Sequence, residues 1–412
     1  MSQAERREQI EEEFKCSYEA QPSLWVRAPG RVDLMGSHTD YNQGYVLTMA
    51  IEQDTWIAAR PRLDRRVSIC SMNVPGEACF DLDKIHKDEQ VRWSNYVRGV
   101  AAVLQAEGHL LTGFDGLIHS TIPVGSGLSS SAALEVATAL LFKSLGKLEI
   151  EPIRLALLCQ QAENEFVGVN CGILDQYSSM MGQAGCSLEL DCRDLSSRSI
   201  PLDAGVKVVI CDTRAKRELT GSEYAERRSQ CDVGMATLSR YYSGVRALRD
   251  VSMEQLERQA CNLEEVVYRR CRFIIEENQR VGEMGAALAA GERASIRRLT
   301  QASYEGARDL YEIGSPEMQT MLDAMLDAPG VIGARQAGAG FGGCLVAFVE
   351  QEEEHDFGLY VERAYMAATG IQPFVYPVQP VDGANLIAFS SQEGALEGRE
   401  SPTRHRRSHE RI

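Results

Sequence analysis

Glycines and serines gather in one segment of the chain in a pattern that suits phosphate binding. The stretch GFDGLIHSTIPVGSGLSSSAALEVATALL starts as an alternating strand, passes two glycines and a serine run, and continues as an alanine-rich and leucine-rich helix. Glycines allow close backbone approach, and the first turn of a helix offers unpaired N–H groups where the macrodipole favours negative charge. The segment therefore predicts a phosphate cradle made of Gly125, Ser126, Gly127, Leu128, Ser129, Ser130 and Ser131.

The same spacing also fits a serine-capped helix that follows a tight turn, because short glycine motifs match by chance. The segment lacks the lysine of the P-loop pattern GxxxxGK[ST], so it is not that phosphate site.

A second segment, GRVDLMGSHTDYNQGYVLTMAI, places an arginine, two aspartates, a histidine and three glycines before an apolar run. Its aspartate Asp40 is followed by Asn42 and Gly44, a spacing that also suits an Asx-turn. A third cluster, GARQAGAGFGGCLVAFVE, runs from glycines into an apolar strand at 344–349. Glycines in such a place indicate a tight turn or a close backbone approach.

The elements that must position these groups can be read from the periodicity of apolar residues. The first twenty residues have the spacing of an amphipathic helix with Ile10 and Phe14 on one face. Strands are expected within 26–59 and 116–123, and a helix after Ser131. Residues 253–310 should form helices with Glu/Arg pairs on exposed faces.

Composition limits the classes of function. A chain of 412 residues with 44% hydrophobic and 25% charged residues should form a soluble protein of two domains. The formal net charge of −16 argues against nucleic acid or a membrane as partner. The chain starts without a secretory signal and its twelve cysteines form no CxxC pair, so we expect a cytoplasmic protein without a disulfide or zinc framework.

The three glycine-containing motifs together resemble those of the GHMP kinases, in the galactokinase branch. The segment that begins at Gly30 is similar to GRxNLIGEHTDYNxGxVLPxA, the segment with the serine run to the phosphate loop PxGxGLSSSA, and the third cluster to RMTGxGFGGC. Two further segments, QQAENEFVGVNCGILDQYSSMMG and RELTGSEYAERRSQC, also look like galactokinase segments. The resemblance extends in order from Trp25 to about Phe389.

This resemblance implies an α+β, two-lobed GHMP kinase fold with the active site in the cleft between the domains. We expect an N-terminal domain at 1–200, a C-terminal domain at 201–390 that holds the second α/β layer and the final strand, and a disordered tail at 391–412. The expected partners are ATP and a small sugar, in a monomer or weak oligomer.

The resemblance also implies a catalytic pair. Asp175 matches the aspartate that accepts or orients the proton of the anomeric hydroxyl. Arg31 would keep this carboxylate ionised and stabilise charge on the transferred group, although a purely structural ion pair is the alternative. The cofactors would be ATP and Mg²⁺, with the metal held by Ser131 and Glu163.

The sugar pocket implied by the resemblance includes Ser37, His38, Asp40, Gly172 and Tyr224. Asp40 would accept hydrogen bonds from the ring hydroxyls at C3 and C4, which is how a carboxylate reads hydroxyl configuration.

Ser37 departs from the family pattern, because it stands where galactokinases carry a glutamate that accepts a hydrogen bond from the C6 hydroxyl. Asp33 for asparagine, Thr48 for proline, and Gln336 with Ala337 for methionine and threonine are further departures. With serine in place of glutamate, the pocket loses the acceptor for the C6 hydroxyl. It also loses the negative charge that would repel a carboxylate at C6. Galactose remains the first expectation, with galacturonate, L-arabinose or a 6-deoxy sugar as alternatives.

Two other hypotheses lie outside sugar phosphorylation. An inactive sugar and ATP sensor should have a damaged phosphate loop or catalytic pair, yet both are intact here. A GHMP enzyme of isoprenoid or amino-acid metabolism would lack HTDYNQG and GFGGC, which favour the sugar branch.

Overall fold

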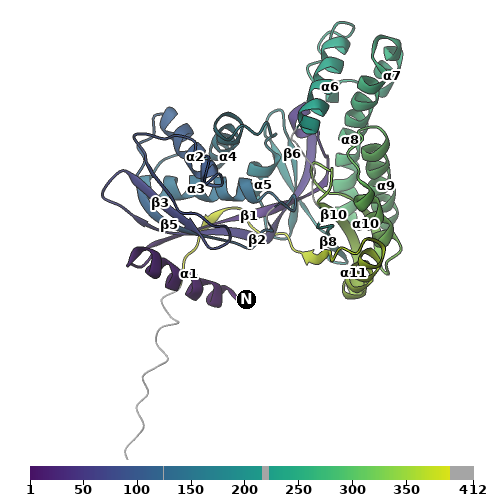
Figure 1. Cartoon of the computed structure of the whole chain (residues 1–412). Helices are drawn as coiled ribbons and strands as arrows, with labels where there is room; N and C mark the ends of the chain where they lie inside the picture. Colours follow the sequence, from purple (N-terminus) through teal and green to yellow (C-terminus); the bar gives the residue numbers. More distant parts are fainter. Residues whose placement is uncertain (124, 216–221, 390–412) are drawn as a thin grey trace, which may run out of the picture.

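The chain folds into two β-sheets surrounded by helices, as the computed structural model in Figure 1 shows. The structure describes residues 1–123, 125–215 and 222–389. The expected disordered tail at 391–412 lies outside these residues. The mixed α/β architecture agrees with the fold class expected from the sequence.

The larger sheet has eight strands in the described part of the chain. Its path is β12-β1-β2-β5-β3-β4, and β6 joins β2 and β7. Its pairings are antiparallel, except that β3 runs parallel to β5. The strands are β1 (Leu24–Met35), β2 (Tyr45–Pro61), β3 (Arg66–Ser71), β4 (Ala78–Asp81), β5 (Phe114–Ser120), β6 (Cys186–Asp191), β7 (Ser197–Pro201) and β12 (Asn385–Leu386).

The smaller sheet is antiparallel, in the order β11-β8-β10-β9. Its strands are β8 (Val206–Asp212), β9 (Val331–Gln336), β10 (Cys344–Glu350) and β11 (Phe374–Val378). The expectation that the final strand belongs to this second layer is wrong, because β12 pairs with β1. After β11 the chain runs back beside β2, through a bridge between Ile51 and Pro380, and covers the free edge of β1.

Helices cover both faces of the larger sheet. Figure 1 shows α2 to α5 on one face and α1 on the other, while α9, α10 and α11 pack on the smaller sheet. The long helix α8 contacts β1, β2, β6 and β7. The helices are α1 (Gln3–Tyr18), α2 (Ser94–Ala106), α3 (Ser130–Gly146), α4 (Pro152–Gln161), α5 (Leu174–Met181), α6 (Ser222–Leu238), α7 (Met253–Arg258), α8 (Glu265–Ala290), α9 (Arg293–Asp309), α10 (Pro316–Leu326) and α11 (Glu354–Thr369).

Short helical turns complete the described structure. They comprise the 3₁₀ turns Asp40–Asn42, Leu248–Asp250, Ala260–Asn262 and Gln351–Glu353, and the π-helical turn Ala162–Val167.

The first helix forms as its sequence predicts. Ser2 and Glu5 make a reciprocal capping box at its start, which satisfies backbone N–H groups of the first turn. Ile10 and Phe14 lie one turn apart on the buried face and pack in a cluster with Trp25 and Trp56.

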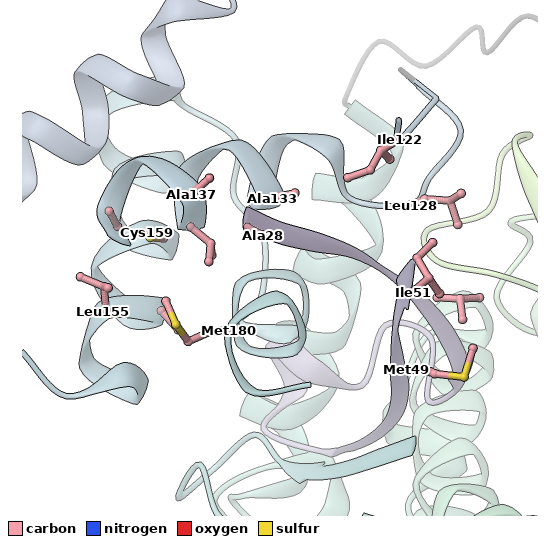
Figure 2. Close-up of a cluster of buried hydrophobic side chains, with 14 of the residues drawn as sticks. Ala28, Met49, Ile51, Ile122, Leu128, Ala133, Ala137, Leu155, Cys159 and Met180 are labelled. Atoms are coloured by element: carbon pink, nitrogen blue, oxygen red, sulfur yellow. The ribbon is translucent and has the colours of Figure 1, made fainter. Parts of the chain in front are cut away.

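The main hydrophobic core fixes the helix that follows the serine run. Ala28 on β1 and Ala133 and Ala137 on α3 belong to this core (Figure 2). Their small side chains let the helix lie close to the strand, and the contacts between α3 and β1 follow from it. The start of α3 is therefore held against β1, where Arg31 lies.

Alternate residues of the smaller sheet enter two different cores. Val208 and Ile210 of β8 belong to the main core, together with residues of the larger sheet. Val209 and Cys211 face a separate cluster that includes residues of α10 and α11. This alternation, which is the normal two-residue period of a strand, ties the two sheets to one core.

Candidate active site

One cleft collects the predicted catalytic and sugar-binding residues. It has a volume of about 230 Å³ and is formed by β1, the loop after it, the segment before α5, the start of α6 and the glycine-rich loop before β10. The cleft is lined by Arg31, Ser37, His38, Asp40, Glu163, Gly172, Asp175 and Tyr224 among others. These residues come from segments up to 193 positions apart in the chain, from Arg31 to Tyr224.

Arg31 and Asp175 form a direct ion pair at the centre of the cleft. Nε and Nη2 of Arg31 both donate to Oδ1 of Asp175, over 2.9 and 2.6 Å. The Asp175 carboxylate lies in the first turn of α5, where the helix dipole favours negative charge. The side chain of Arg31 is 7% exposed and that of Asp175 is 27% exposed, so the carboxylate faces the cleft and the guanidinium supports it.

Ser129 holds the other oxygen of the same carboxylate. Its hydroxyl donates to Oδ2 of Asp175 over 2.6 Å, and Nη1 of Arg31 donates to the carbonyl of Gly127 over 2.7 Å. The glycine-serine loop is therefore bonded to both members of the pair. A carboxylate offers about four lone-pair positions, and three are used here, so Asp175 can still accept one bond from a ligand hydroxyl.

The remaining residues of the predicted phosphate cradle take different positions. Gly125 is exposed, whereas the side chain of Leu128 is buried in the main core, so Leu128 can meet a ligand through its backbone alone. Ser126 donates its hydroxyl to the carbonyl of Pro123. Ser129 adopts a left-handed backbone with φ of 61°, and α3 begins at Ser130.

A second cavity of about 350 Å³ lies on the outer side of this loop. Gly125, Ser130 and Ser131 line it together with the aromatic residues Trp93 and Tyr96. The loop thus lines this second cavity and, through Gly127 and Ser129, also contacts the pair of Arg31 and Asp175 in the cleft. Trp93 packs partly buried against the main core and also forms part of this cavity wall.

Glu163 is a buried carboxylate at the edge of the cleft. It lies in the π-helical turn between α4 and α5, a kind of irregularity that is frequent at functional sites. Burial raises its pKa, and the charge of Asp175 raises it further. Hydrogen bonds from Cys171, Gln176 and Ser131 oppose this shift. The structure therefore brings Ser131 and Glu163 together, and a metal ion held between them stays a prediction.

Asp40 lies opposite Gly172, and the fit between them leaves no room for a larger residue. A Cβ atom on Gly172 would be 1.8 Å from Oδ2 of Asp40, so a side chain at position 172 would displace the carboxylate. Burial and then the charge of Asp175 raise the pKa of Asp40 to about 6. The cleft thus holds two carboxylates whose ionised forms disfavour each other.

His38 orders the wall of the cleft through both of its ring nitrogens. Nδ1 lies 2.8 Å from the hydroxyl of Tyr41, and Nε2 lies 2.9 Å from the carbonyl of Ala339, so Nε2 carries the proton. Burial lowers the pKa of His38 to about 4, which keeps the ring neutral. The rings of His38 and Tyr224 are 5.3 Å apart, and contact of either with a sugar stays a prediction.

Ser37 is bonded to side chains that the sequence analysis did not connect with the site. Its hydroxyl donates to Oδ2 of Asp33 over 2.6 Å and accepts from Nη2 of Arg335 over 2.7 Å. Arg335 was missed because it lies 298 residues away, and although it begins the third glycine motif, that motif does not indicate contact with Ser37. Asp33 could have been found from the sequence, because it follows Arg31 by two residues and side chains at that spacing share one face of a strand.

The described residues contain neither a metal-binding cluster nor a helix that could span a membrane. No cluster of three or more His, Cys, Asp or Glu side chains that could hold a metal ion occurs in them. Within the same ranges, every helix falls short of the length or apolarity needed to cross a membrane.

Models of known families match three parts of the chain. The galactose-binding signature of galactokinases matches residues 12–61, the GHMP kinase N-terminal domain matches 95–183, and the GHMP kinase C-terminal domain matches 285–365. These ranges contain every predicted site residue except Tyr224.

Whole proteins of known sequence and structure agree with these matches. The chain is 43% identical to a galactokinase from Roseiflexus sp. (strain RS-1) over 379 residues, which covers 92% of this chain and 97% of the relative. A galactokinase from Chloroflexus aggregans (strain MD-66 / DSM 9485) is 43% identical over 364 residues, 88% of this chain and 93% of the relative. The structure of Lactococcus lactis galactokinase complexed with galactose matches with a TM-score of 0.88 and 33% identity, covering 92% of this chain and 99% of that one.

Proposed function

This chain belongs to the galactokinase branch of the GHMP kinase family and is an ATP-dependent sugar kinase, and on this premise we propose that it phosphorylates the anomeric C1 hydroxyl of galactose. The observation that carries the proposal is the bonding of Asp175 to both Arg31 and Ser129 at the junction of the cleft and the glycine-serine loop. This bonding supports a role for Asp175 as a proton acceptor beside a loop that would hold the phosphates.

The reaction is a direct transfer between oxygens. The sugar oxygen forms a bond to the γ-phosphorus of ATP as the bond from that phosphorus to the bridging oxygen breaks, and ADP leaves. Asp175 accepts the proton of the attacking hydroxyl through the lone pair left on its carboxylate. Arg31 stabilises the negative charge that develops on the transferred group.

ATP would lie across the glycine-serine loop. The second cavity, lined by Trp93, Tyr96 and Leu134, offers an apolar surface for the adenine base. From there the phosphates would follow Gly125 and Gly127 to the start of α3, where unpaired backbone N–H groups face them. The formal net charge of −16 opposes the binding of anionic phosphates, so local hydrogen-bond donors are needed to hold them.

Glu163 and Ser131 fit a magnesium site next to these phosphates. The carboxylate of Glu163 is buried close to Asp175 and has a raised pKa, so a cation would stabilise its ionised form. Two protein oxygens are few, but Mg²⁺ commonly takes its other ligands from nucleotide phosphates and water. When bound, the ion would neutralise charge on the phosphates.

The sugar would lie between Asp175 and Asp40. Asp40 lies against Gly172 and lines the cleft together with Tyr224, which supports a role for its carboxylate in accepting bonds from two adjacent ring hydroxyls. Galacturonate and L-arabinose remain the alternative substrates, because Ser37 does not supply the carboxylate that the family carries at this position.

ADP release by the purified protein with ATP and magnesium tests this proposal. We expect galactose-dependent ADP release, and NMR of the product should show the phosphate on C1. An inactive sensor would bind both ligands without releasing ADP, so binding without turnover would contradict the proposal.

Sugar binding should weaken in acid. Because the pKa of Asp40 is about 6, its carboxylate is ionised above that pH and accepts hydroxyl bonds, and it becomes protonated as the pH falls. The affinity for galactose, measured by calorimetry without nucleotide between pH 4.5 and 8, should fall about tenfold for each pH unit well below 6.

The variant Asp175→Asn provides the matched control for this titration. It removes the charge that contributes to the raised pKa of Asp40, so the midpoint of the binding curve should move to lower pH. An affinity that is constant between pH 5 and 8 would contradict the role given to Asp40.

A further inference from the structure

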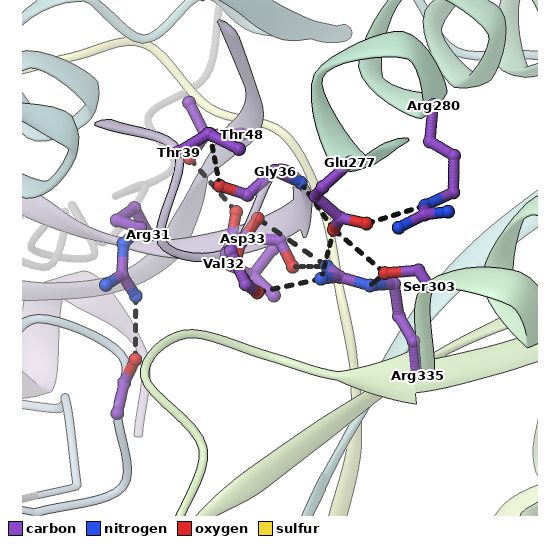
Figure 3. A network of polar contacts seen from close by, with 12 residues as sticks. Arg31, Val32, Asp33, Gly36, Thr39, Thr48, Glu277, Arg280, Ser303 and Arg335 are labelled. Carbon is purple, nitrogen blue, oxygen red and sulfur yellow. Dashed lines mark hydrogen bonds and ion pairs between the residues drawn. The ribbon is translucent and has the colours of Figure 1, made fainter. Parts of the chain in front are cut away.

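A network of buried charges forms the wall of the cleft behind Ser37. Figure 3 shows Asp33, Glu277, Ser303 and Arg335 gathered where β1, α8, α9 and β9 meet. Arg335, Asp33 and Glu277 are each 0% exposed. Arg335 donates from Nε to Ser303 over 3.0 Å and from Nη2 to Glu277 over 3.1 Å.

Asp33 is the incompletely bonded member of this network. Its Oδ2 accepts the hydroxyl of Ser37, but its Oδ1 makes no hydrogen bond within the described part of the chain. The closest cationic nitrogen to Oδ1 is Nη1 of Arg335, at 3.6 Å. A buried carboxylate oxygen without a donor is unfavourable, and such groups in native proteins usually find a partner in a ligand or water.

The position of Asp33 relative to the catalytic pair shows which part of a sugar it would meet. Asp33 lines the same cleft as Arg31 and follows it by two residues on β1, so both side chains project from the same face of the strand. Two residues along a strand span roughly 6.6 Å. A pyranose whose reacting hydroxyl touches Asp175 would therefore bring a distant substituent to Asp33.

We infer that Asp33 determines which substituent the sugar carries at this end, by accepting a hydrogen bond from a neutral hydroxyl through its free Oδ1. The inference rests on the proposed function. It means that the carboxylate missing at Ser37 is supplied four residues earlier in the chain. Ser37 then positions the acceptor, since its hydroxyl donates to the other oxygen of Asp33.

This arrangement separates the candidate sugars. Galactose presents a neutral C6 hydroxyl and satisfies Oδ1. Galacturonate places a second carboxylate against Asp33, which is repelled, and L-arabinose and 6-deoxygalactose lack the donor and leave Oδ1 unpaired. Arg335 already has protein partners for all three nitrogens and so does not offset this repulsion: its Nε and Nη2 donate to Ser303, Ser37 and Glu277, and its Nη1 donates to the backbone carbonyl of Asp33 over 3.5 Å.

A purely structural role for Asp33 accounts for less of the geometry. Arg335 has the Glu277 carboxylate as its hydrogen-bonded counter-ion, while its ion pair with Asp33 is the longer contact, at 3.6 Å. If neutralising Arg335 were the purpose, the carboxylate of Asp33 would be expected to turn its free oxygen onto the guanidinium.

The test compares kcat/KM for galactose, galacturonate, L-arabinose and 6-deoxygalactose in three proteins. In the wild type, galactose should lead each of the others by tenfold or more. In Asp33→Asn, which preserves shape, the ratio of galactose to L-arabinose should fall about tenfold. The charge-conserving variant Asp33→Asn/Ser37→Glu should restore that ratio and should fold even if the single variant does not.

Each outcome is decisive for one claim. A wild-type preference for another sugar, an equal loss on all sugars in Asp33→Asn, or failure of the double variant to regain the galactose ratio overturns the role of Asp33. If the wild-type protein releases no ADP with any of the sugars, the proposed function is overturned as well. If the folded variants release ADP in the presence of galactose, and their kcat/KM ratios between sugars equal those of the wild type, the inference is overturned. The proposed function then still stands.

Discussion

Replacing Asp175 by asparagine should lower kcat by roughly a thousandfold, which is within the range expected for removal of a positioned proton acceptor. Asparagine keeps the size of the side chain, and its carbonyl oxygen can still accept from Arg31. It cannot take a proton from the sugar hydroxyl. ADP release under saturating ATP and galactose measures kcat, and calorimetry on the same variant measures galactose affinity.

The expected pattern is a loss in kcat with galactose affinity changed by less than tenfold, because the proton transfer occurs after the sugar is bound. Ser129→Ala is the matched control. It removes the hydroxyl that donates to Oδ2 of Asp175 but leaves the carboxylate, so the loss should be about tenfold. If Asp175→Asn keeps more than a tenth of the wild-type kcat, another group accepts the proton.

Replacing Glu277 by glutamine should lower the free energy of unfolding by about 3–5 kcal/mol. Glu277 is fully buried and bonds to both Arg280 and Arg335. Burial raises its pKa, but the two arginine charges outweigh this and bring the pKa below its ordinary value. Without the carboxylate, two buried guanidinium groups lose their shared counter-ion. Urea unfolding, followed by circular dichroism, measures the change.

The neighbouring residue provides the control for this experiment. Glu276 also pairs with Arg280, at 3.6 Å, but its side chain is 24% exposed. Glu276→Gln should therefore change the free energy of unfolding by less than about 1 kcal/mol. Similar effects at the two positions would mean that the buried network stabilises the fold no more than an exposed ion pair.

The meeting of Arg31, Ser129 and Asp175 in one cleft could be predicted from the sequence because these residues lie in three local motifs. Arg31 and Asp175 are 144 residues apart, and the resemblance of their motifs to known ones, rather than periodicity, indicated that they meet. The first helix, the strand at 117–119 and the helix after the serine run were also expected, since hydrophobic spacing and capping residues specify them locally.

The environment of Ser37 could not be predicted, because it depends on tertiary contacts without a local pattern. The serine appeared as a missing acceptor in the sequence, whereas in the structure it connects Asp33 to Arg335. In the same way, Ser129 was expected at the nucleotide, but its hydroxyl is bonded to Asp175. A hydroxyl can serve several partners, and only the fold decides which one it meets.

The final strand was expected, but the sheet that β12 joins escaped prediction, because two residues carry too little pattern to choose a partner. Its neighbours in the sequence suggested that it joins the smaller sheet. Instead it pairs with β1 of the larger sheet, whose free edge offers unpaired backbone donors and acceptors.

That return of the chain to β1 has a consequence for synthesis on the ribosome. The strand that carries Arg31 gains its last neighbour when residues 385–386 emerge, and the glycine loop with Ala339 also comes late. The nascent N-terminal half therefore exposes an unpaired strand edge until residues 385–386 have emerged. The binding cleft consequently completes its folding only after these later segments are made, whatever helices and strands form earlier.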